Sequence, residues 1–68
     1  MKKILYPDLV AEMARNGDYQ KTLAKLLEIT EASVTNKLSG KSQWTISEID
    51  KICNHYGKDY YQLFKRND

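Results

Sequence analysis

The chain has 68 residues, of which 41% are hydrophobic and 29% charged, and a net charge of +2. This length allows one small domain, and a single cysteine, Cys53, excludes a disulfide framework. Cys53 and His55 together fall short of a four-ligand zinc site, so we expect no metal and no cofactor. The apolar runs are only a few residues long, which argues against a signal peptide or a membrane span and favours a soluble, cytoplasmic protein.

The first predicted helix begins at Pro7, because proline fits the first helical position and the acidic Asp8 favours a helix N-terminus. Residues 1–6 before it are expected to form a loose arm. The helix is expected to end at Gly17. Its expected buried stripe consists of apolar residues at helical spacing: Leu9, Val10, Met13 and Ala14.

The segment from Gln20 to Lys41 predicts two short helices joined by a tight turn. Asp18 is the better capping side chain for the first of them, and Thr30 is a good N-cap for the second, over about 31–38. Gly40 supplies the glycine that commonly follows a helix. Two helices so closely joined form a helix-turn-helix, whose second helix can enter the major groove of DNA.

The sequence Thr45-Ile46-Ser47-Glu48 predicts a capping box at the start of a fourth helix that ends at Gly57. Its apolar face is expected to contain Ile46, Ile49, Cys53 and Tyr56, with Ile52 flanking it. Asp59 can cap a last short helix, after which residues 65–68 are expected to fray. Tyr56, Tyr60 and Phe64 follow helical spacing, which favours a place in the core over a base-stacking platform. The pattern predicts an all-α fold of five short helices around one core, in a single domain over residues 1–68.

The positive charge is concentrated in the middle of the chain. Residues 1–18 and 47–68 each balance their acidic and basic side chains, so the whole surplus lies within 19–46. There, four lysines outnumber two glutamates: Lys21, Lys25, Lys37 and Lys41 against Glu28 and Glu31. This placement suits a surface that faces phosphate groups, although an ordinary solvated helical face would have the same composition.

Three stretches, YPDLVAEMARNG, VTNKLSGKS and WTISEIDKI, carry a resemblance to a known family. Over about residues 7–64 the chain resembles the phage Cro and repressor class of helix-turn-helix regulators, and especially the short Cro-like proteins of phages and prophages. The resemblance implies a lambda-repressor-like DNA-binding domain with its helix-turn-helix at the second and third helices. This family commonly has glycine after the second helix, where the turn tolerates a positive φ. Here Glu28 stands at that position, at a cost of about 1 kcal/mol if the angle is kept.

By analogy with this family, the third helix carries the residues that face the groove. The expected base contacts are Glu31, Ala32, Ser33, Thr35 and Asn36. Glu31 has two alternative roles: its side chain is bound by Gln20, or it caps the end of the helix. The candidate phosphate contacts are Gln20, Lys21, Lys37, Lys41 and Ser42. Lys37 is expected to face outward.

A domain of this size reads few base pairs, so we expect a weak homodimer on a pseudo-palindromic DNA operator. The expected dimer contacts are Tyr61, Lys65 and Trp44, although Trp44 also fits a role as a lid over the core.

Three functions remain open from the sequence. The first is a sequence-specific transcriptional regulator, a Cro-like repressor acting as a dimer. The second is an antitoxin-type regulator with a protein toxin partner, and the third is a helical interaction module that binds no DNA. An enzyme is disfavoured, because the sequence contains no acid–base, nucleophilic or glycine-rich constellation.

Overall fold

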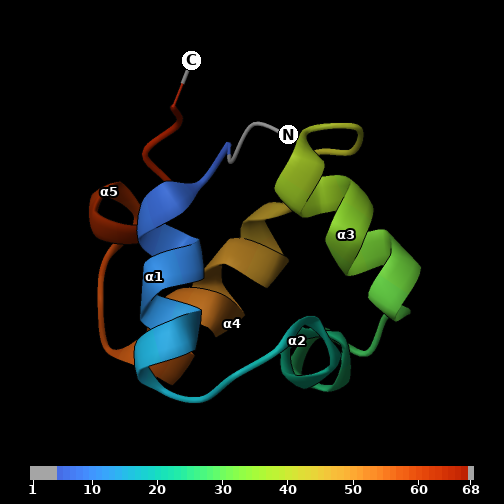
Figure 1. The fold of residues 1–68 in the computed structure, drawn as a ribbon, viewed down its shortest axis with the longest axis horizontal. Helices are drawn as coiled ribbons and strands as arrows, with labels where there is room; N and C mark the ends of the chain where they lie inside the picture. The colour runs from blue at the N-terminus through green and yellow to red at the C-terminus, as the bar shows by residue number, and fades with distance from the viewer. Residues whose placement is uncertain (1–4, 68) are drawn as a thin grey trace.

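A computed structural model describes residues 5–67, which form five short helices and no strand within that range (Figure 1). The helices are α1 (Pro7–Arg15), α2 (Gln20–Leu27), α3 (Glu31–Ser39), α4 (Ile46–Tyr56) and α5 (Tyr60–Leu63). Helix α3 packs on α2, α4 packs on both α2 and α5, and α5 packs on α1. Helices α3 and α5 therefore lie on opposite sides of the molecule (Figure 1). The predicted all-α architecture is confirmed.

Local signals account for most of the helix ends. The capping box at α4 is present: the Thr45 hydroxyl accepts the Glu48 N–H at 3.1 Å, and the Glu48 carboxylate accepts the Thr45 N–H at 2.9 Å. Asp59 caps α5 in the same reciprocal way with Gln62. Gly40 and Gly57 both adopt the left-handed conformation at the ends of α3 and α4, as expected.

The N-terminus of α2 differs from the prediction. Tyr19, and not Asp18, is the N-cap residue, and its N–H donates to the Thr22 hydroxyl at 3.1 Å. The Asp18 carboxylate is engaged elsewhere, because it accepts hydrogen bonds from the Tyr56 hydroxyl at 2.9 Å and from the ring of His55 at 3.1 Å. Burial, followed by the hydrogen bond from Tyr56 to Asp18 and the negative charge of that carboxylate, raises the pKa of Tyr56. Asp18 thus joins the α1–α2 connection to the end of α4.

One hydrophobic cluster lies between the helices. Its buried members are Leu5, Tyr6, Leu9, Met13, Leu23, Ala24, Leu27, Val34, Ile52, Leu63 and Phe64. Leu5 and Tyr6 were expected in a loose arm, which is wrong for these two residues: both are buried, Leu5 against Gly40 at the end of α3 and Tyr6 against the ring of Phe64. Positions 1–4 of that arm lie outside the described residues. The Leu5 carbonyl also accepts the Asn67 N–H at 2.8 Å, so Asn67 in the expected frayed tail is tied to the start of the fold.

Three apolar expectations at helix surfaces are corrected. Val10 and Ala14 are exposed, because Leu9 and Met13 lie on the buried face of α1 and these two residues lie outside it. Ile46 is 80% exposed, since no described element covers its side chain in the first turn of α4. Tyr60 is half exposed and stacks on the ring of Phe64, so it covers the core and is not inside it.

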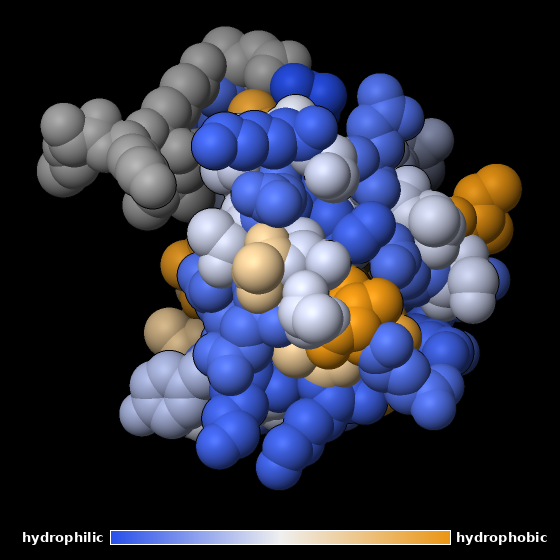
Figure 2. Space-filling model, turned by 90° about the vertical axis from the view of Figure 1, so that its right-hand side faces the viewer, coloured by the Kyte–Doolittle hydropathy of each residue, from blue (hydrophilic) through white to orange (hydrophobic). Residues whose placement is uncertain are grey.

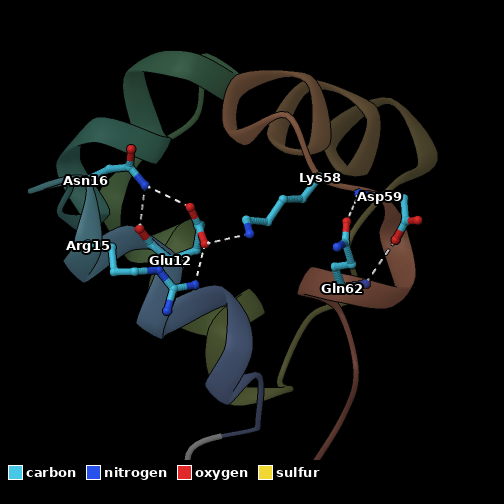
Figure 3. A network of polar contacts seen from close by, with 6 residues as sticks. All are labelled: Glu12, Arg15, Asn16, Lys58, Asp59 and Gln62. Atoms are coloured by element: carbon cyan, nitrogen blue, oxygen red, sulfur yellow. Dashed lines mark hydrogen bonds and ion pairs between the residues drawn. The ribbon is translucent and has the colours of Figure 1, made fainter.

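A polar network on the α1 side holds α5 in place (Figure 3). Glu12 is nearly buried, and its carboxylate accepts hydrogen bonds from Arg15 and Asn16 and lies 3.5 Å from the Lys58 ammonium. The Arg15 hydrogen bond is the main cause that lowers the pKa of Glu12, with Asn16 and the Lys58 charge acting in the same direction against burial. Lys58 directly precedes the cap of α5, so the network links α1 to the turn that positions this helix.

Candidate DNA-binding surface

Helix α3 presents one continuous exposed stripe. Its exposed residues recur at helical spacing: Glu31, Ala32, Thr35, Asn36 and Ser39. On the opposite side of α3, Val34 is completely buried and Leu38 packs against the core cluster, which fixes the rotation of the helix. Figure 2 views the molecule from its α3 side, where the surface is mainly hydrophilic and its hydrophobic residues are scattered. Such a face suits a polar ligand better than an apolar partner.

Four of the five candidate base contacts lie on this stripe: Glu31, Ala32, Thr35 and Asn36. Ser33 lies at its edge, half-buried, and is engaged in the helix cap. The Ser33 N–H donates to the Thr30 hydroxyl at 3.1 Å, and the Thr30 hydroxyl lies 3.0 Å from the Ser33 hydroxyl. The N-cap role expected for Thr30 is confirmed.

A side-chain bridge fixes α2 against α3. The Thr35 hydroxyl lies within hydrogen-bonding distance of both Gln20 Oε1 and the Glu31 carbonyl. The sequence had suggested Glu31 as a partner for Gln20, whereas the structure pairs Gln20 with Thr35. The bridge places the first residue of α2, a candidate phosphate contact, directly beside the exposed stripe.

The turn between the two helices depends on one left-handed residue. Glu28 has φ 58° and ψ 44°, the conformation for which glycine is usual. The Ile29 N–H then donates to the Ala24 carbonyl at 3.0 Å, which closes the end of α2. The backbone angle expected from the family resemblance is therefore kept although the residue is not glycine.

The loop after α3 carries two candidate phosphate contacts, Lys41 and Ser42, and both are exposed. Their backbone N–H groups donate to the carbonyl of Asn36, at 2.9 Å and 3.2 Å respectively. The left-handed Gly40 makes this return possible, with φ 89°. The other two exposed candidates, Gln20 and Lys21, lie in the first turn of α2. Gln20, Lys21, Lys41 and Ser42 are thus all available to a ligand that covers α3.

The sequence predicted that Lys37 faces outward, but its side chain is turned inward. Its ammonium lies 2.9 Å from Glu48 Oε1, donates to the Gln43 carbonyl at 3.0 Å and sits 5.9 Å from the centre of the Trp44 ring. Only 13% of the Lys37 side chain and 14% of the Glu48 side chain are exposed. The expectation failed because the sequence could not show that α4 places a carboxylate beside the end of α3.

Glu48 has two functions in this arrangement. Burial raises the pKa of the Glu48 carboxyl, but the hydrogen bond from the Thr45 N–H and the contact with the Lys37 ammonium outweigh burial and lower it overall. The carboxylate that caps α4 is therefore also the counter-ion of a lysine on α3.

The expected dimer contacts differ in their surroundings. Tyr61 is 83% exposed and Lys65 is exposed, both at the α5 end of the molecule. Trp44 is half-buried and packs edge-to-face on Tyr6 and Phe64, with ring centres 6.4 Å and 5.7 Å apart. Its indole N–H is buried without a hydrogen-bond partner among the described residues. Trp44 thus covers the core, which is one of the two roles that the sequence predicted for it.

Sequence reasoning missed the buried Glu12, the partners of Asp18 and the inward orientation of Lys37. The apolar pair Leu5-Tyr6, directly before the helix start at Pro7, was the one available signal for the extra core residues. Between residues 5 and 67, no group of three or more histidine, cysteine, aspartate or glutamate side chains is placed to hold a metal ion. No helix in that range is both long and apolar enough to cross a bilayer.

A comparison with known families agrees with this geometry. Residues 9–68 match the family of Cro/C1-type HTH DNA-binding domains, so the chain belongs to that family. Members of this family are DNA-binding helix-turn-helix proteins and are typically not enzymes. Searches of curated proteins and of solved structures found no match.

Proposed function

We propose that this protein is a sequence-specific transcriptional regulator, a Cro-like repressor of phage or prophage type that acts in the cytoplasm. Residues 1–68 would act as a single DNA-binding domain. The observation that carries the proposal is the exposed stripe of α3, which a buried Val34 and the Gln20–Thr35 bridge hold in one orientation. Membership of the Cro/C1-type family supports double-stranded DNA as the ligand.

Each residue on the stripe has a proposed role that follows from its chemistry. Asn36 can pair with adenine through both atoms of its amide, and Ala32 can meet a thymine methyl group. Glu31 can accept from a cytosine amino group. Thr35 and Ser33 are proposed as weaker contacts, since both hydroxyl groups already have partners within the protein.

The proposed phosphate contacts flank this stripe on both sides. Gln20 and Lys21 lie at the N-terminus of α2, where backbone N–H groups favour an anion, and Lys41 and Ser42 lie in the loop after α3. Such contacts orient the protein on the duplex and make its affinity depend on salt. Lys37 is left out of this set, because its ammonium is already engaged.

A dimer is proposed because one small domain contacts few base pairs, whereas two copies double the contacts over half-sites about one helical turn apart. Exposed Tyr61 and Lys65 are the proposed contacts, together with the half-buried Trp44. An interface this small predicts a weak dimer that operator DNA strengthens.

Selection of bound sequences from random duplex DNA, followed by footprinting, tests the proposal. We expect a short motif repeated with inverted symmetry, about ten base pairs between the centres of its halves. Sedimentation of the free protein and of the complex should give two protomers per operator. Selection that yields no motif at low salt would contradict the function, and one protomer per operator would contradict the dimer.

A further inference from the structure

The ammonium of Lys37 is held by three groups that all lie outside α3. One is the Glu48 carboxylate in the first turn of α4, one is the Gln43 carbonyl and one is the face of the Trp44 ring. An ammonium has three N–H donors, so two are used in close contacts and the third has an aromatic ring nearby. The Lys37 ammonium is therefore occupied by contacts within the protein, although Lys37 belongs to the helix that is proposed to face DNA.

These contacts enclose the loop that follows α3. At its start, the N–H groups of Lys41 and Ser42 are bonded to the Asn36 carbonyl. At its end, the Thr45 N–H is bonded to Glu48, the same carboxylate that contacts Lys37. Between these two anchors, the Gln43 carbonyl is bonded to the Lys37 ammonium. Hydrogen bonds therefore hold the loop at its start and at its end, with the exposed side chains that are proposed to contact phosphate between them.

We infer that Lys37 is a positioning residue, which holds the loop carrying Lys41 and Ser42 at a set distance from the base-reading stripe and makes no phosphate contact itself. This inference rests on the proposed DNA binding. A nearly buried ion pair adds little stability compared with apolar residues of similar size, but it requires one particular arrangement of its partners. Here that arrangement fixes the loop.

Two substitutions separate positioning from direct contact. Lys37→Met keeps most of the side-chain length and removes the charge, and Lys41→Met is its matched control in the loop. Removing a phosphate contact lowers affinity on every sequence and reduces the slope of log K against log salt by about one. We expect Lys41→Met to do both. We expect Lys37→Met to weaken binding about threefold to tenfold, a typical effect for a residue without ligand contact, with an unchanged slope.

Glu48→Gln provides the second test, because it breaks the same ion pair from the other side. It removes a negative charge near the proposed DNA surface, so simple electrostatics predicts tighter binding. Positioning predicts weaker binding, and it predicts that Lys37→Met combined with Glu48→Gln is no worse than either change alone. Backbone ¹⁵N relaxation of the free protein should show greater mobility at Gln43 and Trp44, the loop residues that Lys37 contacts, in both single variants.

The results would overturn the inference in distinct ways. If Lys37→Met reduces the salt slope by about one, Lys37 is a phosphate contact. If Glu48→Gln tightens binding, or if the loop amides keep their order in both variants, the ion pair does not position the loop. If the wild-type protein binds no DNA at low salt, the proposed function fails, while the relaxation measurements still decide whether Lys37 and Glu48 hold the loop.

Discussion

Replacing Glu28 with glycine should stabilise the protein, which is unusual for a surface substitution. Glu28 is held at φ 58°, and the left-handed conformation costs a residue with a Cβ roughly 1–2 kcal/mol. Glycine avoids this cost but loses about 0.4–1 kcal/mol through the greater freedom of its unfolded chain. The expected net gain in the free energy of unfolding is therefore about 0.5–1 kcal/mol. In a domain of this size, 1 kcal/mol corresponds to a rise in Tm of about 4–8 °C.

The carboxylate of Glu28 complicates a direct comparison with the wild type. Glu28 Oε2 lies 4.0 Å from the Lys51 ammonium, but 85% of the Glu28 side chain is exposed, so this pair contributes at most about 1 kcal/mol. Glu28→Ala loses the same pair and keeps the backbone strain. The informative quantity is thus the difference between Glu28→Gly and Glu28→Ala.

Urea unfolding followed by far-UV circular dichroism measures that difference. Lys25, which is exposed within α2, provides a matched control with ordinary helical angles. At Lys25, glycine should be less stable than alanine by about 1 kcal/mol, whereas at Glu28 the order should reverse. If glycine is no more stable than alanine at Glu28, the turn is not strained and the reasoning fails.

Three further predictions concern specificity, pH and the core. Asn36→Ala should weaken operator binding by roughly 1–3 kcal/mol and leave binding to random DNA nearly unchanged, and equal losses in a gel-shift titration of both duplexes would refute the base contact. Glu12→Gln should reduce the loss of stability on acidification: the lowered pKa of Glu12 contributes stability that is complete above its unfolded pKa and disappears as pH falls through the folded value. Melting curves from pH 7 to pH 3 would test this, and parallel pH profiles would contradict it. Trp44→Phe removes a buried N–H without a partner, a group whose burial costs about 1–3 kcal/mol, so the variant should melt at or above the wild-type temperature; a clear fall would show that the indole ring packs better than phenylalanine can.

The helices and their ends could be predicted because the interactions that define them are local. Thr30, the Thr45–Glu48 pair and Asp59 each bond groups three residues away, so neighbouring residues in the sequence suffice to identify them. Glu28 belongs with these local features. Its left-handed angle was expected from the family pattern, which commonly has glycine at this position.

The candidate surface was predictable for the same reason, but only in part. Val34 and Leu38 lie four residues apart, and this spacing determines that Ala32 and Asn36 point away from the core. Periodicity cannot say whether a long polar side chain at the edge of such a stripe turns outward or inward. That choice depends on what the neighbouring element offers, as the inward orientation of Lys37 illustrates.

Only the packing of the helices decided the long-range partners. Lys37 meets Glu48, Asp18 meets Tyr56 across 38 positions of sequence, and Lys58 reaches Glu12. A charge contacts whichever partner the packed helices bring within a few ångströms, and spacing along the chain carries no information about that distance. For this protein, the sequence by itself determined the helices and the exposed stripe, whereas the tertiary structure decided that the Lys41 side chain is exposed beside this stripe and that the Lys37 ammonium is engaged with Glu48 and Gln43.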